Sequence, residues 1–317
     1  MNNPLISVVI PTHNRKRMLD RLLTSILKST YKNIEIIVID DTSSDGTLEY
    51  VRNKFMKIKI FRNKKNLFTA GSRNAGFKKA KGDFVFFIDD DNILDKYAIE
   101  KMVGEFLKDD NIGELGPVNY NSYNKRKILW ARTKRNVWLS KTNQSRSLTG
   151  FGDKKLWETA DVPNAFMVRT SAVRKNKIFF REKYGIMYEE SDYAYRIRQA
   201  GYKIMVVRDA KIYHDIENEL EGNKGKDYMY HFMEDKRRPY VFARNRIIFH
   251  SIFSSKLEFL SIIFIGIWIF VVYYSYKILF YNGIGEFGLL HRIGLVASYL
   301  KGTLDGISFV ASGQHLN

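Results

Sequence analysis

Short apolar segments alternate with helix-like stretches through the first part of the chain, and this alternation restricts the fold more than any other feature. Each apolar segment is short and rich in Ile, Val and Phe, as expected of a buried strand. Strands that alternate with helices over short links predict an α/β fold with a parallel sheet covered on both faces. The expected strands are 6–10, 34–40, 58–61 and 83–88, and the expected helices include 17–29 and 70–82.

Polar residues follow three of these strands at the point where each strand ends. The clusters are Pro11 to Asn14, Asp40 to Asp41 and Asp89 to Asp91. Ligands of such sheets bind beyond the carboxyl ends of the strands, so we expect the three clusters to form one binding site. The sequence has neither G-x-G-x-x-G after the first strand nor a P-loop motif, which argues against a dinucleotide fold and a P-loop nucleotidase.

The segment FVFFIDDDN, residues 84–92, places three consecutive carboxylates after a buried strand. One carboxylate would suffice to cap the following helix, which is the alternative that needs no ligand. Three carboxylates repel one another unless a positive charge lies among them. Mg²⁺ or Mn²⁺ takes oxygen ligands and bridges phosphate oxygens, so we expect a divalent ion here that neutralises a diphosphate leaving group.

The chain is strongly basic. Its 317 residues include 52 Lys and Arg against 34 Asp and Glu, a formal charge of +18. Such a charge suits a nucleic acid, an anionic membrane surface or a phosphate-bearing substrate. The cations are spread along the chain without a nucleic-acid-binding motif of recognised type, so we expect no nucleic-acid partner. The sequence has no cysteine, which excludes disulfides, zinc–thiolate sites and thiol nucleophiles.

An apolar run near the C-terminal end, residues 257–280, is long enough to cross a hydrocarbon core of about 30 Å. The alternative is a buried helix of a soluble domain. Tyrosines near one end and the basic stretch 236–246 before the other favour a transmembrane helix, with that stretch cytoplasmic and against anionic lipid. Because no signal peptide opens the chain, we expect a cell-membrane protein with a cytoplasmic N-terminal domain. The tail, 285–312, is expected to form helices that lie in the interface or pack on the first span.

Four motifs resemble those of a known enzyme family, and the match covers roughly Ile6 to His214. They are ISVVIPTHNR, EIIVIDDTSSDGT, GSRNAGFKKAKGDFVFFIDDDN and YEESDYAYRIRQAGYKI. In this order they resemble the signatures of the inverting, nucleotide-sugar-dependent glycosyltransferases of family 2. The resemblance implies the GT-A fold, a Rossmann-like sheet that binds a nucleotide sugar and is flanked by helices.

The resemblance implies a division of the chain into three parts. Residues 1–110 would form the nucleotide-sugar-binding half of the GT-A domain and residues 111–246 its acceptor-binding half. Residues 247–317 would form a membrane-associated helical region that contains the transmembrane candidate 257–280. Within the second part, residues 119–155 are rich in Asn, Ser, Lys and Arg without clear periodicity. This composition is typical of a long loop that orders over a ligand, and the alternative is a variable surface loop without a ligand.

The resemblance also implies which residues hold the nucleotide. These are Pro11, Thr12 and Asn14 after the first strand and Asp41 after the second. Asp41 would accept a hydrogen bond from the base, and Arg73 would lie near Asp41.

The D-x-D pattern of the family corresponds to Asp89 and Asp91. Asp89 would approach the ribose, or the metal ion through water, and Asp91 would ligate the ion directly. Asp90, between them, is expected to contribute to donor binding. His214 follows a late strand, where related enzymes often have a further metal or diphosphate contact; the alternative is a structural histidine.

Inversion by a single displacement needs a general base that takes the proton of the acceptor hydroxyl. The family pattern E-D-x-D has its second acid as the base, which implies Glu190, with Glu189 and Asp192 as alternatives. Asp192 lies four residues before Arg196, a spacing at which the two would simply pair, and the acids could merely complement a helix dipole. Asn164 stands where the family usually has a glycine near the donor sugar, so its amide could contact that sugar.

These features predict a metal-dependent glycosyltransferase that moves a sugar from a nucleoside diphosphate to a glycan or lipid-linked acceptor at the cytoplasmic membrane face. Within the same class, the alternative acceptor is a polyprenyl phosphate, which is already an anion and needs no base. Alternatives of another class are a non-catalytic basic nucleotide- or nucleic-acid-binding protein and a degenerate sugar-binding homologue.

Overall fold

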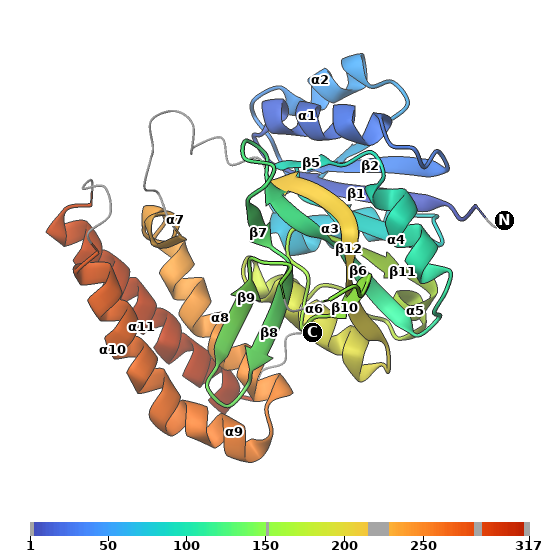
Figure 1. The fold of residues 1–317 in the computed structure, drawn as a ribbon. Coiled ribbons are helices and arrows are strands. Elements are labelled where there is room, and N and C mark those ends of the chain that lie inside the picture. Colours follow the sequence, from blue (N-terminus) through green and yellow to red (C-terminus); the bar gives the residue numbers. More distant parts are fainter. Residues whose placement is uncertain (1–2, 150–151, 215–227, 282–286, 314–317) are drawn as a thin grey trace. The chain divides into compact units, whose positions relative to one another are not determined.

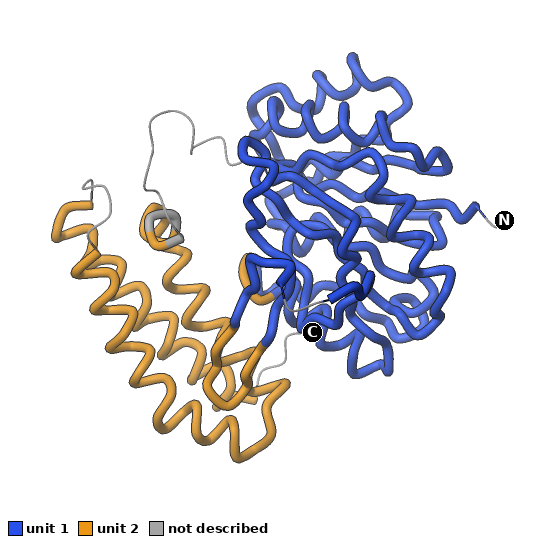
Figure 2. Tube along the Cα trace, viewed as in Figure 1, with its two compact units in different colours: residues 1–134, 143–185, 189–215 blue, residues 135–142, 186–188, 216–317 orange. Residues whose placement is uncertain are grey.

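The computed structural model describes residues 3–149, 152–214, 228–281 and 287–313 (Figure 1). Contacts divide the chain into two compact units (Figure 2). Unit 1 comprises residues 1–134, 143–185 and 189–215, and unit 2 comprises residues 135–142, 186–188 and 216–317. The chain passes between the units several times, so each unit is built from segments distant in sequence.

Unit 1 is built on one ten-stranded sheet (Figure 1). Its main strand order is β10-β12-β6-β11-β4-β1-β2-β3, with β5 paired to β12 and β7 paired to β6. The strands are β1 Ile6–Thr12, β2 Ile34–Asp40, β3 Lys59–Arg62, β4 Phe84–Ile88, β5 Asn92–Leu94, β6 Ile112–Asn121, β7 Ile128–Trp130, β10 Leu156–Glu158, β11 Ala165–Arg169 and β12 Lys203–His214.

The four strands expected from the sequence form one parallel group in this sheet, and β6 and β12 pair in parallel farther along it. β1 pairs in parallel with β2 and β4, and β2 pairs in parallel with β3. The predicted α/β arrangement is therefore confirmed. Beyond β4 the sheet is mixed, because β11 runs antiparallel between β4 and β6.

Helices cover both faces of the sheet, because successive side chains of a strand point to opposite faces. Ile6, Val8 and Ile10 of β1 pack with α1, α2 and α4 on one face, and Val9 packs with α3, α5 and α6 on the other. The helices of unit 1 are α1 Lys16–Leu27, α2 Thr47–Lys54, α3 Phe68–Lys79, α4 Ala98–Phe106, α5 Thr170–Lys175 and α6 Glu189–Gln199, with a short 3-10 helix η1 at Glu182–Tyr184.

One sheet joins residues 1–110 to residues 111–246, because β6, β11 and β12 join the sheet that contains β4. The boundary expected after residue 246 differs from the observed one. Residues 228–246 belong to unit 2 rather than to the sheet domain. The helix α8, Arg237–Phe253, continues through residue 246 without a break, so no boundary can lie there.

Residues 119–155, expected to form a long loop, instead contain strands. β7 pairs with β6, and β8 Arg132–Asn136 pairs with β9 Lys141–Ser145 in a separate two-stranded sheet. Four of the five residues of β9 are exposed. A strand without a buried face needs no alternation of apolar and polar residues, so its periodicity gave no sign of a strand.

Unit 2 contains a set of packed helices. Its described helices are α7 Tyr228–Glu234, α8, α9 Lys256–Ser261, the π-helical segment η3 Ile262–Gly266, α10 Ile267–Leu279 and α11 Leu289–Ala311. α11 packs along α8 and α10. Residues 285–286 of the expected tail lie outside the described residues. Most of the remaining tail forms α11, which packs on α10 of the apolar run. Packing on the first span is one of the two arrangements expected for the tail.

Small residues bring α11 close to α8. The Ser298 hydroxyl donates to the Lys236 carbonyl at 2.7 Å. One helical turn further along α11, a Cβ atom on Gly302 would lie 2.2 Å from the Tyr240 carbonyl oxygen. A glycine at this position therefore permits a backbone approach that any side chain would block.

α9, η3 and α10 follow one another without a break and form the expected apolar helix. In the part of the chain that the structure describes, this run, Lys256–Leu279, is the one helix long and apolar enough to cross a membrane. Its large side chains are mostly exposed; Phe264 and Val272, for example, are each 70% exposed. The run is therefore not a buried core helix of the described chain.

Candidate active site

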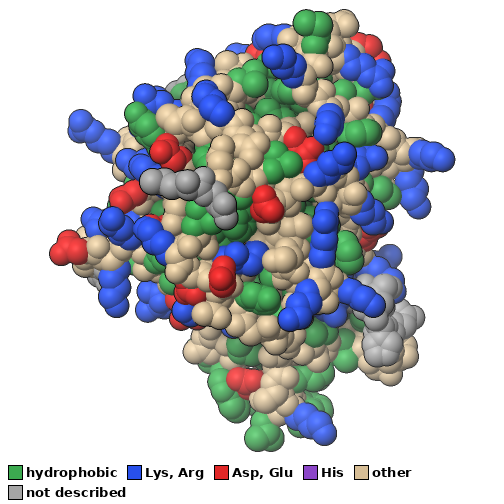
Figure 3. All heavy atoms as spheres, turned by 90° about the vertical axis from the view of Figure 1, so that its right-hand side faces the viewer, with side chains coloured by type: hydrophobic (Ala, Val, Ile, Leu, Met, Phe, Trp, Pro, Cys, Tyr) green, Lys and Arg blue, Asp and Glu red, His purple; other side chains and the backbone are tan. Residues whose placement is uncertain are grey.

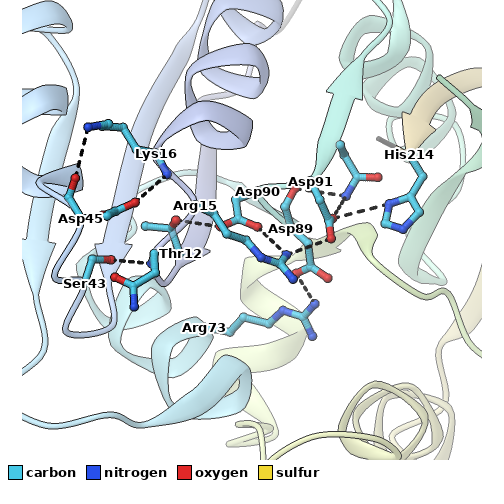
Figure 4. A network of polar contacts seen from close by, with 12 residues as sticks. Thr12, Arg15, Lys16, Ser43, Asp45, Arg73, Asp89, Asp90, Asp91 and His214 are labelled. Carbon is cyan, nitrogen blue, oxygen red and sulfur yellow. Dashed lines mark hydrogen bonds and ion pairs between the residues drawn. The ribbon is translucent and has the colours of Figure 1, made fainter. Parts of the chain in front are cut away.

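The polar clusters after β1, β2 and β4 meet at one edge of the sheet (Figure 4). Pro11 and Thr12 end β1, and the Thr12 hydroxyl donates to Asp90 Oδ2 at 2.7 Å. The Asp41 N–H donates to the Thr12 carbonyl at 2.8 Å. The convergence expected from the strand order is therefore confirmed.

Two arginines lie among the carboxylates that follow β4 (Figure 4). Arg15, in the turn after β1, places Nη1 3.0 Å from Asp90 Oδ1 and 2.9 Å from Asp91 Oδ2. Arg73 of α3 places Nη2 2.7 Å from Asp89 Oδ1. Two arginines of the chain therefore lie between the three carboxylates. The sequence predicts only a metal ion as the positive charge among them.

Arg73 also joins the carboxylates after β4 to the start of α6. Its Nη2 lies 2.8 Å from Glu190 Oε1. The side chain has no exposed surface, and its guanidinium carbon lies 5.4 Å from the ring centroids of both Phe166 and Phe180. Arg73 is expected near Asp41, but its ion pairs are with Asp89, a candidate metal-binding acid, and with Glu190, the candidate base.

Asn164 completes this link through its backbone. Its N–H donates to Glu190 Oε1 at 3.0 Å, and its carbonyl accepts from the Asp89 N–H at 2.9 Å. The φ angle of Asn164 is 67°, in the left-handed region that glycine and asparagine tolerate better than most residues. This conformation explains why an asparagine can occupy the position at which the resembling enzymes have a glycine.

Burial shifts the acids of this site toward their protonated forms. Burial raises the pKa of Asp90 to about 7, with Arg15 opposing the shift and Asp91 reinforcing it. Burial and the charge of Glu190 raise the pKa of Glu189 to about 8. Burial also raises the pKa of Glu190, although Arg73 opposes this. A carboxylate whose pKa moves toward neutrality becomes a better proton acceptor.

The three acids at the start of α6 have different surroundings. Asp192 has no exposed surface and pairs with Arg181 and Arg196, each at 2.7 Å. This is the pairing that the spacing to Arg196 predicted, with Arg181 added, and it occupies both carboxylate oxygens. Glu189 is buried, whereas the Glu190 side chain is 19% exposed. Glu190 is therefore the acid of the three best placed to meet a substrate.

The remaining residues expected to hold the nucleotide order the neighbouring loops. Buried Asp41 accepts at Oδ1 from Asn63 Nδ2, at 2.8 Å, and from the Leu67 N–H, at 2.9 Å. Asn14, with a φ of 53°, accepts at Oδ1 from the Ser44 N–H at 2.7 Å. These bonds fix the loops after β2 and before α3, which border the site.

Asp91 and His214 are the side chains best suited to a metal ion. His214, at the end of β12, has Nδ1 3.5 Å from Asp91 Oδ1, and that nitrogen is buried without a hydrogen bond to any described residue. A carboxylate oxygen and an imidazole nitrogen fit Mn²⁺, and the oxygen fits Mg²⁺. Within the described ranges, no group of three His, Cys, Asp or Glu side chains could hold an ion. An ion here would therefore take its other ligands from phosphate oxygens and water.

Arg15 is the candidate that sequence reasoning missed. The motif ISVVIPTHNR contains it, but roles were assigned only to Pro11, Thr12 and Asn14. The available signal was a basic residue in the turn after the first strand, at the same sheet edge as the triple aspartate. The backbone role of Asn164 left no signal of its own beyond the replacement of a glycine.

Known proteins with similar sequences point in the same direction. The family model "Glycosyl transferase family 2" matches residues 7–179, more than half of the chain. An uncharacterized glycosyltransferase of Haemophilus influenzae is 37% identical over 111 residues, which cover 34% of this chain and 44% of that protein. The Escherichia coli UDP-Glc:alpha-D-GlcNAc-diphosphoundecaprenol beta-1,3-glucosyltransferase WfgD is 32% identical over 130 residues, 41% of this chain and 51% of that protein. The chain thus matches about half the length of these relatives.

Solved structures show the same fold. The mannosyltransferase PcManGT from Pyrobaculum calidifontis, in complex with GDP-Man and Mn²⁺, aligns with a TM-score of 0.57 at 16% identity, over 99% of this chain and 80% of that one. At this identity the likeness shows the fold alone, and it confirms the expected GT-A fold. The family model that matches residues 7–179 shows that the chain belongs to glycosyl transferase family 2.

Proposed function

We propose that this protein is an inverting glycosyltransferase that moves a sugar from a nucleoside diphosphate sugar to a lipid-linked acceptor. One observation carries the proposal. A single nitrogen atom of buried Arg73 holds both Asp89, at the end of β4, and Glu190, at the start of α6. The groups proposed for the leaving diphosphate and for the acceptor proton are thereby fixed relative to each other, as displacement at one sugar carbon requires.

Glu190 is the proposed general base. Both hydrogen bonds that described residues make to its carboxylate end on Oε1, from Arg73 and from the Asn164 N–H. Oε2 can therefore accept the proton of the acceptor hydroxyl. The oxygen of the acceptor hydroxyl bonds to the anomeric carbon from the face opposite the phosphate. As it does so, the proton of the hydroxyl passes to Glu190 and the bond between the anomeric carbon and the diphosphate breaks.

Asp91 and His214 would bind a divalent ion directly and Asp89 would approach it through water, so that the ion holds the diphosphate. When bound, the ion neutralises the charge of the leaving group. The Arg15 side chain is 48% exposed, so it can turn from the aspartates toward phosphate oxygens. PcManGT, which shares the fold, carries GDP-Man and Mn²⁺, and this supports the same class of ligand here.

The nucleotide would lie against the loops after β1 and β2. Pro11, Thr12, Asn14 and Asp41 border this place, and the bond from Thr12 to Asp90 joins it to the diphosphate end. The hydrogen bonds that order these loops in the protein support a preformed site.

Two observations support a lipid-linked acceptor at a membrane. The name of the Escherichia coli relative gives its acceptor as alpha-D-GlcNAc-diphosphoundecaprenol. The run Lys256–Leu279 exposes large apolar side chains, among them Phe264, Trp268 and Val272, which a hydrocarbon layer would cover. The catalytic domain would then face the cytoplasm, with basic residues of α8 near anionic lipid.

The distribution of charge supports a membrane and a phosphate-bearing substrate rather than a nucleic acid. On the face drawn in Figure 3, Lys and Arg are scattered among hydrophobic and neutral side chains instead of forming one stripe. Nucleic-acid-binding proteins typically gather their basic side chains on one surface.

A donor screen tests the proposal. Purified protein is melted with each nucleoside diphosphate sugar, in Mn²⁺ and in EDTA, and donors that stabilise it are assayed for transfer to a sugar-diphosphate-polyprenol. A donor at a hundredfold excess over its Kd stabilises by about 2.7 kcal/mol, which a melting curve resolves. Metal-dependent stabilisation and a product of inverted anomeric configuration are expected. A protein that binds donors but transfers none of them to any lipid-linked acceptor would contradict the proposal.

A further inference from the structure

A buried arginine of unit 2 has no carboxylate partner among the described residues. Arg246 lies on α8 and is 5% exposed. Its Nε lies 3.4 Å from the Tyr188 hydroxyl and its Nη2 lies 3.4 Å from the Tyr274 hydroxyl, both long for hydrogen bonds. Its Nη1 is buried and bonds to no residue that the structure describes. A charged group is thus removed from water without the partners that it needs.

Another buried guanidinium of the chain, that of Arg73, is stabilised by two carboxylates. Arg246 has aromatic rings instead. Its guanidinium carbon lies 4.1 Å from the ring centroid of Phe270, 4.3 Å from that of Phe242 and 5.2 Å from that of Tyr274. Cation–π contacts offset part of the desolvation cost but bring no negative charge. Because arginine keeps its proton in proteins, the positive charge remains.

The surroundings add further positive charge. We call Arg246 with Tyr188, Phe242, Phe270 and Tyr274 the Arg246 cage. The guanidinium carbon of Arg135, also in unit 2, lies 5.5 Å from the ring centroid of Tyr188. Burial, with the charges of Arg135 and Arg246, lowers the pKa of His250 to about 3, so the field at α8 is positive.

We propose that the Arg246 cage binds the phosphate or diphosphate group of a lipid, and that in the reaction proposed above this group belongs to the lipid-linked acceptor. A planar guanidinium flanked by two hydroxyl groups matches phosphate oxygens. Phe270 and Tyr274 lie on α10, whose Trp268 and Val272 are exposed, so the anion would lie beside the helix expected to contact lipid. Tyr188 directly precedes Glu189 and Glu190 in the chain.

Binding of a soluble lipid diphosphate tests the cage. The full chain is titrated in detergent with farnesyl diphosphate, with farnesol and with inorganic pyrophosphate. EDTA is present throughout, because it prevents diphosphate binding through a metal ion at the aspartates. The wild type should bind farnesyl diphosphate more tightly than it binds farnesol or inorganic pyrophosphate. Arg246→Met should lower the affinity for farnesyl diphosphate at least about tenfold. Arg246→Lys keeps the positive charge but lacks the paired N–H donors of the guanidinium, so it should lower this affinity less.

Thermal stability separates a binding role from a structural one. Removal of a buried charge that lacks a partner should leave the Tm of the ligand-free protein unchanged or raise it. Arg292 provides the matched control, because its Nη1 donates to the Leu279 and Tyr281 carbonyls. Arg292→Met should lower the Tm and leave the affinity for farnesyl diphosphate unchanged. If Arg246→Met lowers the Tm as Arg292→Met does and binds farnesyl diphosphate like the wild type, the proposal is wrong.

Two further arms complete the test. If Arg246→Met does not fold, Tyr188→Phe and Tyr274→Phe each remove one hydroxyl from the cage, and unchanged affinity in both would overturn the proposal. Binding to vesicles that contain phosphatidylglycerol, compared with vesicles of phosphatidylcholine alone, distinguishes a membrane phospholipid from the lipid-linked acceptor. If Arg246→Met binds the phosphatidylglycerol vesicles more weakly than the wild type, the cage binds membrane phospholipid. If Arg246→Met loses affinity only for farnesyl diphosphate, the cage binds the acceptor. Stabilisation of Arg246→Met by donor and Mn²⁺ should match the wild type, so a failure of donor binding concerns the proposed function and not the cage.

Discussion

Arg73 Nη2 lies 2.8 Å from Glu190 Oε1, although the two residues are 117 positions apart in the chain. The contact joins α3 to α6 across the buried part of unit 1, with Asp89 bound to the same nitrogen. One buried cation therefore sets the position of two acids with different proposed roles. Its removal should affect stability as well as chemistry.

Arg73→Met should destabilise the fold by about 3–5 kcal/mol, because it leaves Asp89 and Glu190 partly buried without their shared cation. Urea denaturation measures the free energy of unfolding. Lys54→Met serves as the control, since Lys54 pairs with Asp20 at 2.5 Å but is 47% exposed, and exposed ion pairs contribute little to stability. Equal effects of the two substitutions would show that the burial of Arg73 is unimportant.

Glu190→Gln should lower kcat by about 10²–10⁴-fold and leave donor affinity unchanged, because the amide oxygen can still accept from Arg73 but cannot take a proton. Steady-state transfer and donor titration measure the two quantities. Glu100→Gln, at a surface residue that accepts from the Thr30 hydroxyl, is the control. Full activity of Glu190→Gln would favour transfer to a polyprenyl phosphate, which needs no base.

Arg15→Gln should raise the affinity for Mn²⁺, measured without donor, by at least about threefold, since Arg15 and a metal ion compete for the charge of Asp90 and Asp91. Calorimetric titration gives the affinity. Lys108→Gln makes the same charge change at an exposed pair with Glu105 and should have little effect. A lower affinity in Arg15→Gln would mean that Arg15 supports the ion instead of competing with it.

The contribution of Glu189 to the stability of the ligand-free protein should fall as pH rises from about 4.5 to about 8. Burial and the charge of Glu190 raise the pKa of Glu189 to about 8 in the folded protein, against an ordinary value of 4.5. Between these values the folded protein holds a proton that the unfolded chain has released, so the contribution is full below the lower value and is lost as pH rises through the upper one. The free energy of unfolding of Glu189→Gln, measured relative to that of the wild type, should therefore increase as pH rises over this window. An identical pH dependence in variant and wild type would contradict the assignment.

Gly302→Val should loosen the packing of α11 on α8, because its Cβ would lie 2.2 Å from the Tyr240 carbonyl oxygen, a backbone atom that cannot turn away. Overpacking of this kind costs about 1–3 kcal/mol. Gly104→Ala in α4 is the control, since no atom lies within 4 Å of its new Cβ, and alanine should stabilise the helix by about 0.5–1 kcal/mol. Melting curves by circular dichroism compare the two variants. Wild-type stability in Gly302→Val would show that the helices separate at little cost.

Local patterns predicted the parallel strands and the edge at which their polar residues meet. The apolar runs of β1, β2 and β4 report burial directly, and parallel strands must bring their carboxyl ends to one edge. Thr12 and Asp90 could therefore be placed together before any coordinates were known. The strand β9 could not be predicted in this way, because exposed residues leave no periodic trace of a strand.

The sequence by itself determined the α/β fold, the polar edge of the sheet and the apolar helix of unit 2, because each follows from which residues must leave water. Only the tertiary structure decided which charges neutralise one another. It paired Arg73 with Glu190, set Arg15 between Asp90 and Asp91, and left Arg246 without a described acid. The physical reason is distance: burial is a property of one element and appears in its periodicity, whereas an ion pair depends on a few ångströms between side chains that only the packing of separate elements can set.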